Sequence, residues 1–106
     1  MGEENSCCPI VNAMKLLGGK WKLPILFRLM GGQTRFSALA SLIPDVSRKV
    51  LSEQLKQMEK DGLVHRKQFD QNPPKVEYSL TQHAQKLKPI LEDLCRWNKS
   101  SMNPPE

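Results

Sequence analysis

Side chains able to form hydrogen bonds with nucleic acid are concentrated in residues 47–61, a stretch that is followed directly by Gly62. Ser47 is a natural N-cap, and Leu51, Leu55 and Met58 recur at helical spacing, which predicts an amphipathic helix. Its opposite side would present long donors and small hydroxyls, which suit base edges in a DNA major groove and the flanking phosphates. The residues on that side are Arg48, Lys49, Ser52, Glu53, Lys56, Gln57 and Lys60. A solvated face is the alternative for such a helix taken alone, so the neighbouring elements decide between the two.

Three helices are predicted before this stretch, and they place it in a helix-turn-helix arrangement. The first starts near Pro9 and ends at the paired glycines 18–19, and the second covers about residues 20–30. The third is short and has Thr34 as its predicted N-cap. A tight turn at Pro44-Asp45 then leads to Ser47. A short helix, a turn and a helix with a basic outer face form the helix-turn-helix pattern.

After Gly62 the apolar pattern changes from helical to alternating, which predicts a β-hairpin. Residues 63–69 and 76–80 form its strands, and residues 70–74 are rich in turn formers. Arg66, Lys67 and Lys75 lie on or beside the hairpin, and Arg35 lies at the start of the preceding helix. An ordinary solvated hairpin is the alternative for these charges. Because the hairpin follows a helix-turn-helix, we expect it to act as a wing and the four cations to hold phosphates.

The last predicted helix runs from its N-cap Thr81 to about Lys99, and Pro89 should kink or interrupt it. Its apolar arc is wider than one neighbour needs, and a chain of 106 residues has little interior to absorb it. A single core that absorbs the whole arc is the alternative. We expect instead that part of the arc meets a second copy, helped by the N-terminal helix. The residues expected at this dimer interface are Ile10, Val11, Met14, Ile90, Leu91, Leu94 and Trp97.

The predicted fold is mainly α with a small antiparallel β-hairpin, a winged helix-turn-helix DNA-binding domain with terminal dimerisation helices. Residues 8–99 form this single domain, and residues 1–7 and 100–106 are predicted to be flexible tails. Sixteen Lys and Arg against eleven Asp and Glu give a net charge of +5, which favours a polyanionic partner. No apolar run approaches the roughly 20 residues that span a bilayer, and the first six residues differ from a signal peptide, so we expect a cytoplasmic protein with no membrane partner.

Residue types that would support catalysis or hold a cofactor are scarce. Two histidines lie far apart, and neither a phosphate-cradling glycine pattern nor a group of carboxylates occurs. The three cysteines have no paired metal spacing. The sequence therefore predicts no enzyme activity, no cofactor and no metal site.

Short segments spread from Cys8 to Trp97 occur together in a specific order. They read CP at 8–9, GGKW at 18–21, RFSAL at 35–39, VSRKVL at 46–51, DGLVHR at 61–66 and PKVEYSLT at 74–81. In this combination the chain resembles the HxlR family of bacterial transcriptional regulators, which are similar in architecture to the MarR group. The resemblance implies a dimer whose terminal helices form the interface, with the helix of residues 47–61 in the major groove. His83-Ala84 departs from the family pattern, in which an apolar residue is followed by Gly.

Two functions from different classes are compatible with these residues. The first is a sequence-specific regulator that binds double-stranded DNA as a homodimer. Its two recognition helices would enter major grooves about 34–36 Å apart, so its operator would be an inverted repeat. The second is a winged-helix module for protein interaction or dimerisation without specific DNA binding. The basic outer face of residues 47–61 favours the first.

Cys8 is the candidate signal-sensing residue. It lies near a predicted helix start, where the helix dipole favours the reactive thiolate. The resemblance implies the same role, because some family members sense oxidants or electrophiles through the cysteine that precedes proline. An unreactive N-terminal thiol is the alternative. Cys7 is the candidate accessory thiol, and Cys95 is expected to be packed on the apolar side of the last helix.

Overall fold

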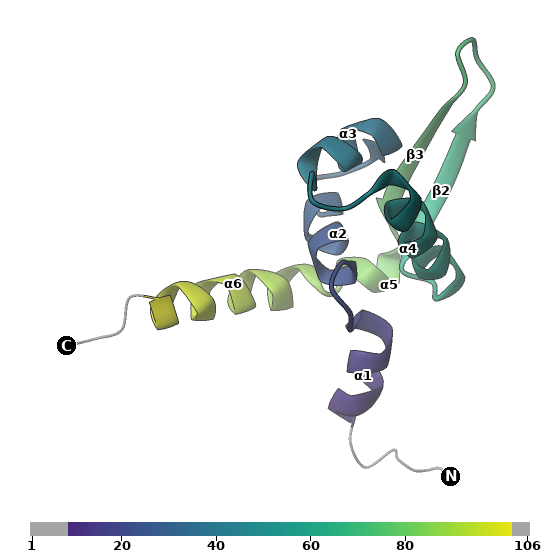
Figure 1. Ribbon diagram of the computed structural model, residues 1–106. Helices are drawn as coiled ribbons and strands as arrows, with labels where there is room; N and C mark the ends of the chain where they lie inside the picture. Colours follow the sequence, from purple (N-terminus) through teal and green to yellow (C-terminus); the bar gives the residue numbers. More distant parts are fainter. Residues whose placement is uncertain (1–8, 103–106) are drawn as a thin grey trace.

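The computed structural model describes residues 9–102, with the side chains of residues 9–100. Figure 1 shows α2, α3 and α4 grouped beside the long hairpin of β2 and β3, while α1 and α6 extend away from this group in different directions. In chain order the elements are α1 (Pro9–Leu17), α2 (Lys22–Leu29), β1 (Thr34–Arg35), α3 (Phe36–Leu42), α4 (Arg48–Lys60), β2 (Val64–Phe69), β3 (Lys75–Leu80), α5 (Gln82–Gln85) and α6 (Lys88–Met102). The fold is mainly α with an antiparallel sheet, so the predicted fold class is confirmed.

Helix α4 has the ends and the buried side that its sequence predicts. The Oγ of Ser47 accepts a hydrogen bond from the N–H of Val50 at 3.1 Å and so caps the helix. Gly62 follows with a φ of +79°, a left-handed conformation that stops the helix. The side chains on the buried side, each 0% exposed, are Leu51, Leu55 and Met58. Their burial determines how α4 is rotated about its axis and leaves the opposite side in solvent.

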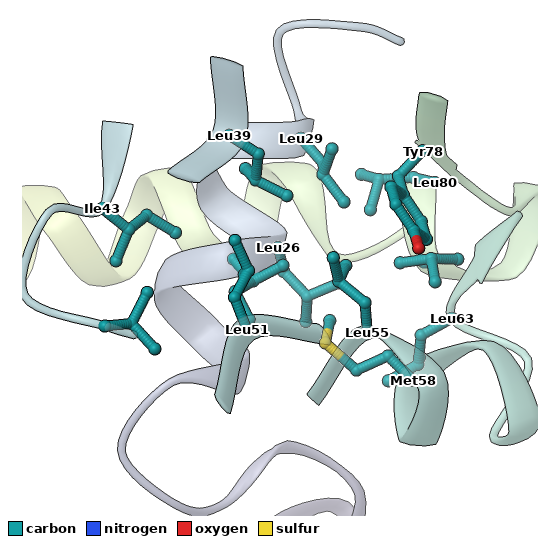
Figure 2. Packing of buried hydrophobic residues seen from close by; sticks show 14 of the residues in the cluster. Leu26, Leu29, Leu39, Ile43, Leu51, Leu55, Met58, Leu63, Tyr78 and Leu80 are labelled. Atoms are coloured by element: carbon teal, nitrogen blue, oxygen red, sulfur yellow. The ribbon is translucent and has the colours of Figure 1, made fainter. Parts of the chain in front are cut away.

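The core forms where α2, α3, α4 and the sheet meet (Figure 2). Burying one leucine, isoleucine or methionine side chain stabilises the fold by about 1.5–3 kcal/mol relative to leaving it exposed. Tyr78 and Leu80 bring β3 into the same cluster. The other members labelled in Figure 2 are Leu26, Leu29, Leu39, Ile43, Leu51, Leu55, Met58 and Leu63. One group of side chains therefore anchors both α4 and the base of the hairpin.

The sheet has one strand more than the hairpin that the sequence predicts. Thr34–Arg35 form β1, which pairs with Tyr78 and Glu77 of β3 and gives the strand order β1-β3-β2. The predicted N-cap role of Thr34 is therefore wrong, because α3 begins after Arg35 and the Oγ1 of Thr34 donates instead to the carbonyl of Gly32 at 2.8 Å. A two-residue strand is too short to show an alternating pattern in the sequence, so only its pairing with β3 in the structure identifies it.

The C-terminal segment consists of two helices rather than one. The predicted helix is interrupted, but at residues 86–87 rather than at Pro89, since α5 ends at Gln85 and α6 begins at Lys88. Pro89 therefore lies in the first turn of α6, where a missing N–H costs least. Helix α6 continues to Met102, beyond the expected end at Lys99.

Two residues of this segment lie elsewhere than predicted. Leu91, expected at a dimer interface, is 6% exposed and packs in the core of its own chain. Cys95, expected to be packed, is exposed, because α6 leaves the body of the protein after its first turns (Figure 1). Ala84, at the departure from the family pattern, is 1% exposed, so this position has room for a small side chain.

Thr81 connects the end of α4 to the start of α5 through two hydrogen bonds. Its Oγ1 donates to the carbonyl of Gly62 at 2.7 Å and accepts from the N–H of Ala84 at 3.1 Å. Thr81→Val keeps the shape but removes both bonds, so we expect the free energy of unfolding to fall by about 1–2 kcal/mol in urea denaturation. Ser41→Ala is the control, because that exposed hydroxyl bonds within its own helix to the Ser37 carbonyl, and it should change stability by less than about 0.5 kcal/mol. An equal loss in both variants would contradict the connecting role.

Candidate nucleic-acid interface

The outer side of α4 carries an exposed stripe of polar and charged side chains. Its predicted members are Arg48, Lys49, Ser52, Glu53, Lys56, Gln57 and Lys60, and all are exposed. These positions recur one helical turn apart, so they share the side opposite the buried residues. Ser47 lies at the N-terminal end of the stripe. Its oxygen accepts the capping bond, and its O–H remains able to donate.

A hollow of about 370 Å³ lies between α3, α4 and the hairpin. Arg35, Arg66 and Lys75, three of the four predicted phosphate-holding cations, border it. Ser37 of α3 and Ser52 of α4 add hydroxyl groups to its lining. A concave surface that combines guanidinium, ammonium and hydroxyl donors is suited to an anionic group such as phosphate. Residues predicted separately from three elements thus meet in one site.

Phe36, Ser37 and Tyr78 are residues of this site that the sequence pattern did not indicate. All three border the hollow. Phe36 packs against the buried cluster, and Tyr78 is a member of it. The available signal was the adjacency of Arg35, Phe36 and Ser37, since the start of one helix can present three consecutive residues to a common surface.

The structure separates the two adjacent cations of the wing. In the β2–β3 register Arg66 lies opposite Tyr78, which is buried, whereas Lys67 lies opposite Glu77. Because successive side chains of a strand point to opposite faces, Arg66 lies on the face toward the hollow and Lys67 on the outer face of the sheet. The Nζ of Lys67 lies 5.1 Å from the ring centroid of Phe69.

Glu77 is an acidic residue among the cations of the wing, and the sequence pattern did not indicate a role for it either. Its Oε1 accepts a hydrogen bond from the Nε2 of Gln33, and its Oε2 lies 3.2 Å from the Nζ of Lys75. The hydrogen bond from Gln33, aided by Lys75, holds the pKa of the Glu77 carboxyl below its usual value. Lys75 therefore has an anionic partner already. Arg66 has no such partner within residues 9–102, where its recorded contact is the Oε1 of Gln68 at 3.4 Å.

Helices α1 and α6 expose large apolar side chains. Six of the seven residues predicted at a dimer interface are exposed, from 48% for Leu94 to 67% for Ile10. The others are Val11, Met14, Ile90 and Trp97. Helix α1 buries none of its own residues. Because large apolar groups in water mark surfaces that bind other chains, both helices have surface available for a partner.

Cys7 and Cys8 lie outside the described residues. Cys95 of α6 is a free cysteine. Among residues 9–102, no group of three or more His, Cys, Asp or Glu side chains could hold a metal ion. Over the same range, the helices are too short or too polar to cross a membrane.

The helix-turn-helix of α3 and α4, followed by the hairpin, defines a winged helix-turn-helix protein of the transcriptional-regulator class. The family model described as HxlR-like helix-turn-helix matches residues 16–106, and the chain belongs to this family. An HTH-type transcriptional regulator of Halalkalibacterium halodurans is 49% identical over 96 residues, which cover 90% of this chain and 85% of the relative.

Solved structures support the same assignment. A chain from Porphyromonas gingivalis, described as a transcriptional regulator of the MarR family, has a TM-score of 0.85 at 34% identity, covering 93% of this chain and 95% of that chain. The redox regulator HypR in its reduced form has a TM-score of 0.84 at 36% identity, covering 89% of this chain and 93% of that chain. The predicted family and its MarR-like architecture are therefore confirmed.

Proposed function

We propose that this chain is a sequence-specific DNA-binding transcriptional regulator that acts as a homodimer on an inverted-repeat operator. The observation that carries the proposal is the exposed stripe of α4 beside the basic hollow, because it puts base-reading and phosphate-holding groups on one surface. Arg48 and Lys49, at the N-terminus of α4, would contact base edges or nearby phosphates. Ser52, Glu53 and Lys56 would follow one turn later, where Glu53 could accept from a cytosine amino group.

The hollow would hold the DNA backbone beside this groove contact. Of the two wing cations that border the hollow, Arg66 is the stronger candidate for a phosphate contact, since its guanidinium lacks a carboxylate partner within residues 9–102. Arg35, directly before α3, and Ser37, in the first turn of α3, would contact phosphates of the same DNA strand. Lys75 would contribute less, because Glu77 already offsets its charge. Lys67 would reach phosphates beyond the outer face of the wing.

The second copy would bind through α1 and α6. Their exposed apolar residues lie outside the group of α2, α3 and α4 that carries the DNA-facing surface (Figure 1). A dimer formed there would leave both copies of α4 in solvent. A two-fold axis between the copies would then set the two α4 helices in successive major grooves, about 34–36 Å apart.

We also propose that oxidants or electrophiles modulate binding through Cys8, with Cys7 as accessory thiol. HypR, which is similar to this chain, is described as a redox regulator and has been solved in reduced and oxidised forms. Cys8 directly precedes Pro9, the first residue of α1. The start of a helix favours the thiolate, which is the form that reacts.

The proposed function predicts preference for one DNA sequence. Reduced protein titrated by fluorescence anisotropy should bind DNA from upstream of its own gene more tightly than a shuffled fragment, at two salt concentrations, since base contacts survive when phosphate contacts are screened. Arg48→Ala should lose on the order of 1–3 kcal/mol of binding free energy and relax the preference at one base pair. Equal binding to both fragments would contradict sequence specificity, and no binding at low salt would favour the interaction module.

The wing should contribute measurably to the salt dependence of binding. Arg66→Ala removes a phosphate contact, so the slope of log K against log salt should become shallower by about 1. Glu77→Gln should have the opposite effect, because it releases Lys75 and removes a negative charge from the wing. Unchanged slopes in both variants would exclude the wing from the interface.

The dimer should depend on the apolar surface of α6. Leu94→Lys places a charge in the proposed interface and should give monomers in sedimentation velocity at concentrations where the unmodified protein is dimeric. Leu42→Lys is the matched control, because Leu42 of α3 is exposed to a similar degree, 44% against 48%, and lies outside the terminal helices. Loss of the dimer in both variants, or in neither, would contradict the assignment.

Redox control should act at one thiol. Mass spectrometry after mild peroxide or quinone treatment should find an adduct or a disulfide at Cys8, and Cys8→Ser should abolish the change in DNA affinity that the treatment causes. Cys95→Ser, which removes the exposed thiol of α6, should leave that change intact. An unmodified Cys8 would rule out the sensor.

A further inference from the structure

Arg48 is the first residue of α4, at the end of the helix where base contacts are expected. Its side chain is exposed, and within residues 9–102 the recorded ion pairs involve other residues. The guanidinium of Arg48 lies over an aromatic ring instead. The guanidinium carbon lies 6.0 Å from the ring centroid of Phe36, over the ring. This contact limits the conformations of a side chain that is otherwise free to sample many.

Phe36 is itself held in place by the core. It is the first residue of α3 and packs against the buried cluster. Its ring centroid lies 6.5 Å from that of Tyr78, with an angle of 53° between the ring planes, which is a tilted aromatic contact. Tyr78 is 7% exposed and, with Leu80, brings β3 into the core (Figure 2). The ring beneath Arg48 is therefore a fixed part of the fold.

We propose that Phe36 is a positioning residue that orients the guanidinium of Arg48 for a DNA contact. The inference rests on the proposed function, because it assigns how one of the proposed contacts is prepared. A guanidinium held over an aromatic face by cation–π attraction leaves its N–H donors available for a base edge or a phosphate. An aliphatic side chain would fill the same space without offering that face.

The contact is specific to Arg48 among the cations of α4. The other cation–ring contacts recorded within residues 9–102 involve Lys20, Lys67 and Lys75, none of which belongs to this helix. Phe36 and Tyr78 also border the basic hollow. The aromatic pair thus connects the end of α4 proposed to read bases with the surface proposed to hold phosphate. A substitution of Phe36 should therefore weaken the DNA contact of Arg48 and leave the other contacts of the interface unchanged.

A double-mutant cycle tests the positioning role. The DNA is the tightest-binding duplex that the unmodified protein selects from a random pool. Phe36→Leu should weaken binding to it by about two- to fivefold, whereas Phe36→Tyr, which keeps the aromatic face, should bind as the unmodified protein does. In an Arg48→Ala background, Phe36→Leu should cause no further loss. The same loss in both backgrounds would overturn the inference, because Phe36 would then act through packing alone.

A second measurement does not need DNA. In the free protein, the δ-methylene protons of Arg48 should show ring-current shifts in the NMR spectrum that disappear in Phe36→Leu and persist in Phe36→Tyr. Persistence of these shifts in Phe36→Leu would overturn the contact itself. If the unmodified protein selects no sequence from the pool, the proposed function fails and the positioning role fails with it. If it selects one and the cycle is additive, the positioning role fails alone.

Discussion

The burial of one side of α4 determines what the protein presents to solvent. Leu51, Leu55 and Met58 lie in the same core as α2, α3 and the base of the sheet, and a different rotation of the helix would expose them at a cost of several kcal/mol. The charged stripe is therefore held outward at a defined angle. Every group proposed to contact DNA, on α4, on α3 and in the hollow, is oriented relative to that buried side.

The same buried core also fixes which way the side chains of the wing point. Because Tyr78 and Leu80 are buried, strand alternation sends Arg66 toward the hollow and Lys67 to the outer face. The outer face also holds Glu77, whose carboxylate forms an ion pair with Lys75. A run of basic residues along the hairpin is thus divided into groups with different surroundings. Of the wing cations that border the hollow, Arg66 has no carboxylate partner in the described part of the chain, and we place the main wing contact there.

The two terminal helices expose apolar side chains, whereas the group of α2, α3, α4 and the sheet buries them. Helices α1 and α6 extend from the core and expose seven large apolar residues that a single chain does not cover. Leu91 shows where the body ends, since it is buried while Leu94 of the same helix is exposed. The division separates two proposed tasks. Contact with DNA would fall to the group of α2, α3, α4 and the wing, and pairing of two copies to α1 and α6.

The sequence by itself determined α4, its Ser47 cap and its buried side, and also the Thr81 cap of α5, because capping and the 3.6-residue spacing act over short distances along the chain. It also determined the family, since the matching segments are read in order along the chain. The tertiary structure decided the rest. Strand β1 exists through its hydrogen bonds to β3, and the burial of Leu91 depends on where α6 leaves the body. The meeting of Arg48, Phe36 and Tyr78 joins residues far apart in sequence, so it follows from packing and could not be obtained from spacing.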